Sequence, residues 1–103
     1  MEKLNFSYNW NGKLNCTFFT TLRRANPEKY RVGSRFAVEF KNSQLGIVEV
    51  VDCKNVTLNS LNDWVLALDT GYTGNAGKDI FRKMYKLKDN EDLLLSFVLF
   101  KYV

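Results

Sequence analysis

The sequence predicts a single α+β domain in which a mostly antiparallel, five-stranded, barrel-like β-sheet is combined with two helices. Three observations lead to this expectation. A chain of 103 residues is too short to give each of two domains a core of its own. The composition is 46% hydrophobic and 15% aromatic, which suits a sheet whose interior is filled by bulky side chains. The apolar patterns follow the order strand, strand, strand, strand, helix, helix, strand.

The first two predicted strands form a hairpin. Between residues 4 and 10 apolar and polar side chains alternate, which is the period of a half-buried strand. Asn11-Gly12 follows, and this pair favours a two-residue turn because both turn positions need positive φ. The alternation resumes over residues 14–22. We therefore expect these two strands to pair with each other in antiparallel fashion.

The next two predicted strands lie on either side of a short turn. Asn26-Pro27 breaks the preceding pattern, and a strand follows over residues 35–41, in which alternate apolar side chains share one face. Residues 42–44 form the turn. The largely apolar segment 45–53 is then predicted to be a central strand.

Two amphipathic stretches predict the helices. The apolar residues of the first recur at helical spacing, at Leu58, Leu61, Val65 and Leu68. Thr57 is the predicted N-cap and Gly71 the predicted end of this helix. Residues 73–77 are predicted to be a loop, and the second helix is expected to begin at Asp79.

The end of the chain predicts a charged turn over residues 88–92 and a last strand over residues 93–102. The apolar run in this strand is too short to span a bilayer.

The first five residues show no signal peptide, so we expect a cytoplasmic protein with Cys16 and Cys53 as reduced, buried thiols. The chain has no histidine, which excludes a histidine-dependent catalytic triad, and its two cysteines lack metal-ligand spacing. We expect no metal and no cofactor.

The charge distribution favours an anionic ligand at one place. The net charge is +4, and residues 1–41 hold eight basic against three acidic side chains. Arg23 and Arg24 lie at a predicted strand end, where they should either face water or hold an anion. Asp69 lies at a predicted helix C-terminus, where the macrodipole opposes a carboxylate. It is therefore either an exposed residue or one compensated by a cation such as Arg23 or Arg24.

Two further patterns are open to more ordinary interpretations. The three glycines between Gly71 and Gly77 follow a predicted helix, so we interpret them as a connection between helices and not as a nucleotide-binding loop. Four basic residues recur at helical spacing, at Lys78, Arg82, Lys83 and Lys86. Such a stripe is either the solvated face of an amphipathic helix or a contact to phosphates.

The succession of motifs resembles that of the ASCH domains, which are small PUA-like β-barrels. Thr21-Leu22-Arg23 lies about ten residues before Tyr30-x-Val32-Gly33-Ser34, and the resemblance continues through Asp69-Thr70-Gly71-Tyr72 to the final aromatic strand. It covers roughly residues 13–103 in order and spacing. The resemblance implies a PUA-like barrel with a cleft that binds RNA or nucleotides.

Some members of that family are similar to nucleoside amidohydrolases. In those members a lysine stands five residues before the motif arginine, a threonine stands two before it, and an acidic residue lies near the end of the first helix. Thr21, Arg23 and Asp69 match these positions, whereas Phe18 occupies the lysine position. Lys13 could take its place only if the chain between Lys13 and Thr21 folds back.

We therefore expect the protein to bind RNA, single-stranded nucleic acid or a nucleotide through a basic cleft. The residues expected to form this cleft are Lys13, Thr21, Arg23, Arg24, Tyr30, Asp69 and Tyr72. The first alternative is a metal-independent nucleoside amidohydrolase. The second is a structural or interaction module, for example one of phage origin. If residues 13–22 form one regular strand, Lys13 and Thr21 lie roughly 26 Å apart, so we expect no amide cleavage.

Overall fold

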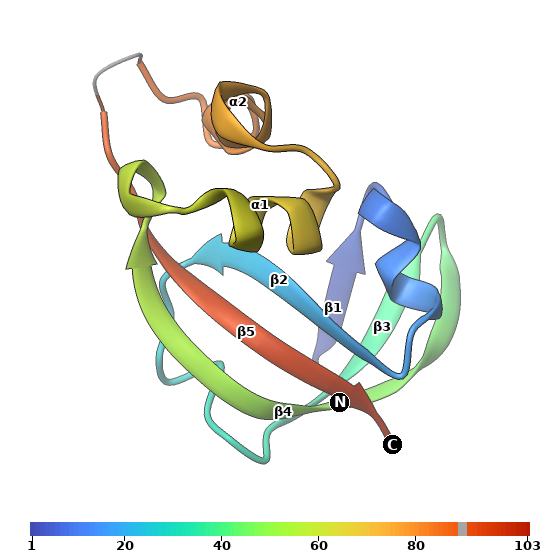
Figure 1. Cartoon of the computed structure of the whole chain (residues 1–103). Coiled ribbons are helices and arrows are strands. Elements are labelled where there is room, and N and C mark those ends of the chain that lie inside the picture. Colours follow the sequence, from blue (N-terminus) through green and yellow to red (C-terminus); the bar gives the residue numbers. More distant parts are fainter. Residues whose placement is uncertain (89–90) are drawn as a thin grey trace.

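The computed structural model describes residues 1–88 and 91–103. Its centre is a strongly curled, five-stranded mixed sheet that forms a half-barrel (Figure 1). The spatial order of the strands is β1 (Lys3–Phe6), β3 (Arg35–Phe40), β4 (Ser43–Thr57), β5 (Leu94–Tyr102) and β2 (Phe18–Arg24). The edge strands β1 and β2 are therefore the two ends of the curled sheet.

The middle of the sheet follows the predicted pattern. β3 and β4 pair in antiparallel fashion through a turn in which Lys41 and Asn42 have φ of 51° and 64°. β4 then continues to Thr57, beyond the predicted end at residue 53, and pairs with β5 along most of its length. The register between β4 and β5 shifts between Val50 and Asp52, which is where a bulge lets a long strand bend.

The predicted hairpin between the first two strands is wrong. β1 pairs with β3, and this pairing is parallel, while β2 pairs with β5. Asn11 and Gly12 have the positive φ of a turn, 58° and 64°, but they lie inside a 3₁₀ segment, η1 (Trp10–Asn15). This segment carries the chain away from β1 toward the opposite edge of the sheet, so the sheet is mixed and not purely antiparallel.

The helices lie together on one side of the sheet (Figure 1). Thr57 precedes a short 3₁₀ turn, η2 (Leu58–Ser60), and does not cap an α-helix. The first α-helix, α1 (Asp63–Thr70), begins five residues later than predicted and is capped by Asn62, whose Oδ1 accepts a hydrogen bond from Val65 N at 2.9 Å. Gly71 ends α1 with φ of 82°, as predicted.

The predicted loop over residues 73–77 is also wrong. The second helix, α2 (Gly74–Met84), already begins at Gly74. α1 and α2 cover a second apolar cluster that includes Leu58, Leu66 and Leu95, whereas the main core lies inside the curled sheet. β5 begins within one residue of its predicted start. In the predicted charged turn, residues 89 and 90 lie outside the described part of the chain.

Three further observations complete the fold. Cys16 and Cys53 are free, but Cys16 is exposed and Cys53 is half-buried, so the expectation of two buried thiols is wrong. Across residues 1–88 and 91–103, no helix combines the length and apolar character that crossing a membrane requires. Within the same ranges, no group of three or more acidic, cysteine or histidine side chains could hold a metal ion.

Candidate functional site

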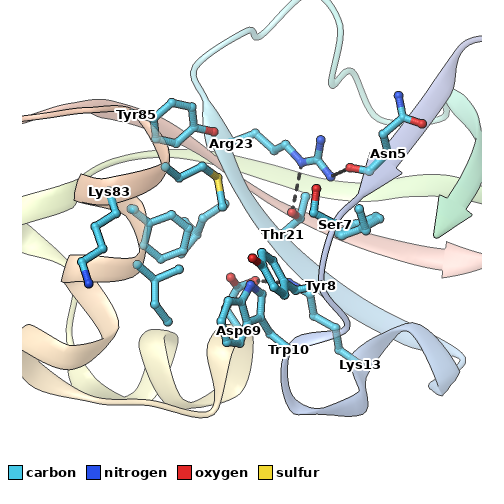
Figure 2. Close-up of a pocket in the computed structure, with 15 residues that line it drawn as sticks. Asn5, Ser7, Tyr8, Trp10, Lys13, Thr21, Arg23, Asp69, Lys83 and Tyr85 are labelled. Atoms are coloured by element: carbon cyan, nitrogen blue, oxygen red, sulfur yellow. Dashed lines mark hydrogen bonds and ion pairs between the residues drawn. The ribbon is translucent and has the colours of Figure 1, made fainter. Parts of the chain in front are cut away.

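A cavity of about 590 Å³ lies where the half-barrel is open. Its walls come from β1 and the residues after it, from β2, and from α2, while Lys13 of η1 and Asp69 of α1 also line it (Figure 2). The open edge between β1 and β2 and the helices above it therefore create the site together.

Arg23 joins the two sides of this opening. Its Nη2 donates to the backbone oxygen of Asn5 on β1 at 2.7 Å, and its Nε donates to Thr21 Oγ1 at 3.3 Å (Figure 2). The guanidinium also lies 4.6 Å from the centre of the Phe6 ring. Burial lowers the pKa of Arg23, but an arginine keeps its charge at neutral pH. The cavity wall thus carries a fixed positive charge.

A buried ion pair lies in another part of the wall. Lys13 Nζ is 3.1 Å from Asp69 Oδ1, and Thr20 Oγ1 donates to the same oxygen at 2.8 Å. The side chains of Lys13 and Asp69 are only 7% and 3% exposed. Burial raises the pKa of the Asp69 carboxyl and lowers the pKa of the Lys13 ammonium, although each group opposes the shift of the other. Burial therefore disfavours the charge on both groups.

The η1 turn explains how Lys13 reaches this position. Leu14 next to it is buried in the main core, and Leu14 N donates to Asn9 Oδ1 at 2.9 Å, which fixes the turn. Asn11 Nδ2 donates to the Ala67 oxygen of α1 at 3.4 Å, so η1 is also joined to the helix that carries Asp69. The expectation of one regular strand over residues 13–22 is wrong, because β2 begins only at Phe18.

Aromatic side chains form much of the remaining wall. Tyr8 and Trp10 follow β1, and their ring centres lie 5.0 Å apart with a tilt of 33°. Phe6 and Tyr85 also line the cavity, together with Phe81 and Met84 of α2. An apolar, aromatic cavity with a few converging charged groups is the usual construction of a site for a small organic ligand.

The structure brings four of the residues named from the sequence into this cavity: Lys13, Thr21, Arg23 and Asp69. Of the two alternatives for Asp69, compensation by a cation is confirmed and exposure is wrong, because Asp69 is buried and paired with Lys13. The expected cation, Arg23 or Arg24, is wrong. Of the predicted basic stripe on α2, Lys83 lines the cavity.

The other three residues lie elsewhere. Tyr30 is buried in the main core, with its ring centre 5.9 Å from that of Phe36, and is not available for stacking with a ligand. Arg24 is exposed and does not line the cavity, although its guanidinium lies 5.2 Å from the ring centre of the cavity-lining Tyr85. Tyr72 lies outside the cavity lining and contacts Trp10 edge-on, at 6.0 Å between ring centres.

Sequence reasoning did not select Tyr8 and Trp10 as ligand-binding residues. Their alternation with polar residues was assigned to a strand, but β1 ends at Phe6. The available signal was that the alternation runs directly into the Asn11-Gly12 turn, so these aromatic residues flank a change of chain direction.

Comparison with solved structures supports the fold. The chain is similar to the crystal structure of protein EF3133 from Enterococcus faecalis V583, which is described by the family model DUF984. The TM-score is 0.62 at 16% sequence identity, and the match covers 82% of this chain and 60% of that one. This chain thus corresponds to less than two thirds of that protein. No protein-family model and no curated protein matches the sequence.

Proposed function

We propose that the cavity between β1, β2 and α2 binds a nucleoside or nucleotide, either free or as part of RNA or single-stranded nucleic acid. The observation that carries this proposal is the combination of aromatic walls with the Arg23 guanidinium in one cavity. Bases stack on aromatic rings, while arginine pairs with phosphates, so the two features suit the two halves of one ligand.

The dimensions of the site agree with this ligand class. A volume of about 590 Å³ falls within the range of pockets for small organic molecules. Tyr8 is exposed at the cavity and Tyr85 is half-buried, so a ring can enter beside them. We also propose that the half-barrel belongs to a divergent ASCH domain, on the strength of the motif succession that ends in Asp69-Thr70-Gly71-Tyr72.

The test is equilibrium titration of the protein with the four nucleoside 5′-monophosphates and with short oligonucleotides at low and moderate salt. We expect binding that weakens as salt rises, because phosphate contacts release counterions. Arg23→Met should weaken binding at least tenfold through loss of a charged contact. Arg24→Met is the matched control, because Arg24 is an exposed neighbour that does not line the cavity. Absence of binding by the wild-type protein at low salt would refute the proposal.

A second candidate function is cleavage of an acylated nucleoside. The observation that favours it is that Lys13, Thr21 and Asp69 all line one cavity. Because β2 begins only at Phe18, the separation of roughly 26 Å expected for a regular strand between Lys13 and Thr21 no longer applies. In such a reaction the Thr21 hydroxyl attacks the acyl carbon while neutral Lys13 takes its proton. The exocyclic nitrogen then leaves with a proton, and water hydrolyses the acyl ester of Thr21.

This candidate requires Lys13 to lose its proton, and burial lowers the pKa of Lys13 in the required direction. The measurement is turnover of N-acylated nucleosides by the wild-type protein, by Lys13→Met and by Thr21→Val. Turnover that rises with pH and disappears in both variants, while nucleoside binding persists, would establish the reaction. If the wild-type protein binds nucleosides but does not turn over N-acylated nucleosides, the hydrolase candidate is refuted and the binding function stands.

A further inference from the structure

A row of three aromatic side chains continues from the cavity to the outer surface. Tyr8 and Trp10 line the cavity. Tyr72 lies at the outer end of the row, with its ring centre 6.0 Å from that of Trp10. We call Tyr8, Trp10 and Tyr72 the aromatic row. Tyr8 is 59% exposed and Tyr72 is 50% exposed, so both ends of the row present ring surface to solvent. Figure 2 shows Tyr8 and Trp10 at the cavity, near Asp69 and Lys13.

The exposed Tyr72 is attached to a well-fixed segment of backbone. Tyr72 N donates to the hydroxyl of the buried Thr70 at 3.1 Å, and this hydroxyl donates to the Leu66 oxygen at 2.7 Å. Gly77 of α2 approaches so closely that a Cβ there would lie 2.9 Å from the Tyr72 oxygen. Because this backbone is already ordered, a ligand that stacks on Tyr72 has little further chain entropy to remove.

We infer that Tyr72, at the outer end of the aromatic row, forms a second base-binding subsite and that the natural ligand is a single-stranded nucleic acid of two or more nucleotides. This inference rests on the proposed function of the cavity. One nucleotide occupies the cavity beside Tyr8 and Trp10, and the base of its neighbour stacks on Tyr72. The row is continuous with the cavity, so a strand can enter one subsite and leave through the other.

Two features favour a nucleic acid over a protein partner at this surface. The contact surface consists of ring faces and edges, which is the construction of sequence-tolerant sites for single strands. Two cations line the cavity into which the row leads, the exposed Lys83 of α2 and Arg23 of β2. These groups are available to the phosphates on either side of the base in the cavity.

The experiment compares ligand length at one fixed ionic strength. The four nucleoside 5′-monophosphates and the corresponding homotetranucleotides are titrated into wild-type protein, Tyr72→Ala, Tyr72→Phe and Trp64→Ala. We expect the best tetranucleotide to bind the wild type roughly tenfold more tightly than its monophosphate, since stacking of one base on a ring is worth about that factor. Tyr72→Ala should abolish this gain, and Tyr72→Phe should keep it.

The controls separate this inference from its alternatives. Trp64 is 82% exposed on α1 and does not line the cavity, so Trp64→Ala should keep the gain. Extra phosphates alone would give Tyr72→Ala the same gain as the wild type, and that result would overturn the inference. Monophosphate binding without any gain for the tetranucleotide would also overturn it while leaving the proposed function intact. If neither ligand binds, the proposed function fails, and this inference fails with it.

Discussion

Lys13 and Asp69 form an ion pair that is almost completely removed from water, with 3.1 Å between Nζ and Oδ1. Transfer of both charges from water into this site costs free energy, and the mutual attraction offsets that cost only while both partners are present. Thr20 helps by donating a second hydrogen bond to Asp69 Oδ1 at 2.8 Å. Each buried charge therefore lowers the stability of the folded state unless its partner is present.

A double-mutant cycle tests this dependence. Lys13→Met and Asp69→Asn should each lower the free energy of unfolding by roughly 3 kcal/mol, because each leaves one buried charge without its partner. The double variant should recover most of this loss, since the introduced amide can still accept the Thr20 hydrogen bond and no charge is buried. Urea denaturation measures all four proteins. Additive losses in the double variant would show that the pair is not coupled.

The loss of unfolding free energy in the two single variants should depend on pH in opposite directions. In Lys13→Met the pKa of Asp69, already raised by burial above 3.8, rises further because the lysine is gone. The folded state then holds a proton that the unfolded chain releases, so the loss of stability is small in acid and grows as pH rises from about 3.8 through the folded pKa. In Asp69→Asn the pKa of Lys13 falls further, so the loss should shrink as pH rises toward 10.5.

At the scale of elements, the start of α1 depends on one side chain. Asn62 accepts a hydrogen bond from Val65 N, whereas Thr57 donates its hydroxyl hydrogen to Ser60 Oγ at 2.8 Å outside any α-helix. Asn62→Ala should lower the free energy of unfolding by about 1 kcal/mol through loss of the cap, and Asn62→Gly by only a few tenths. Thermal and urea denaturation measure the difference. Thr57→Ala is the comparison, and a larger loss there than in Asn62→Ala would contradict this assignment.

The helix positions also show what sequence patterns can and cannot predict. The predicted end of α1 at Gly71 is confirmed, because a left-handed C-cap has a strong local preference for glycine. The predicted start after Thr57 is wrong, although Leu58 and Leu61 continue the apolar spacing of the helix. In the structure both are buried, but in the η2 turn and the segment after it, so burial and not helical periodicity explains their type.

The same limit explains the error in the first part of the chain. Asn11-Gly12 predicts a pair of residues with positive φ, and the structure has them. Such a pair does not specify which strands meet, because β1 can bury Leu4 against β3 as well as against β2. The patterns of β3, β4 and β5 are recognisable within each segment, because apolar residues alternate in β3 and form largely apolar runs in β4 and β5. Only β3 and β4 are joined by a short turn.

Several polar and charged residues of the candidate site could be named from the sequence, but the contacts between them could not. Arg23 is indicated by its place at the end of an apolar strand and Asp69 by its place at a helix C-terminus, whereas Thr21 is indicated only by the resemblance to the ASCH motif. The partner of Asp69 was not predictable, because Lys13 and Asp69 are 56 residues apart and meet only through the η1 turn. Tyr30 was misassigned because an aromatic residue between basic residues looks the same in sequence whether its ring is buried or exposed.

At the scale of the whole molecule, the half-barrel is open between β1 and β2, and Arg23 spans that opening. β1 has only four residues and hydrogen-bonds to one neighbouring strand, so we expect it to be the least protected strand of the sheet. Arg23→Met should increase amide hydrogen exchange over residues 3–6 severalfold, while Arg24→Met should leave it unchanged. Nucleotide binding should slow this exchange in the wild type. Equal exchange in Arg23→Met and the wild type would show that the arginine does not hold β1.

Two strand edges that face an opening also present unpaired backbone groups to any other extended chain. Natural sheets guard such edges with short strands and with charged side chains directed inward, and here β1 supplies the first device and Arg23 the second. The arginine that we assign to ligand binding is thus also a barrier to edge-to-edge pairing between molecules. A substitution that removes it should therefore favour self-association at high protein concentration, and an occupied cavity should counteract that tendency by holding the opening filled.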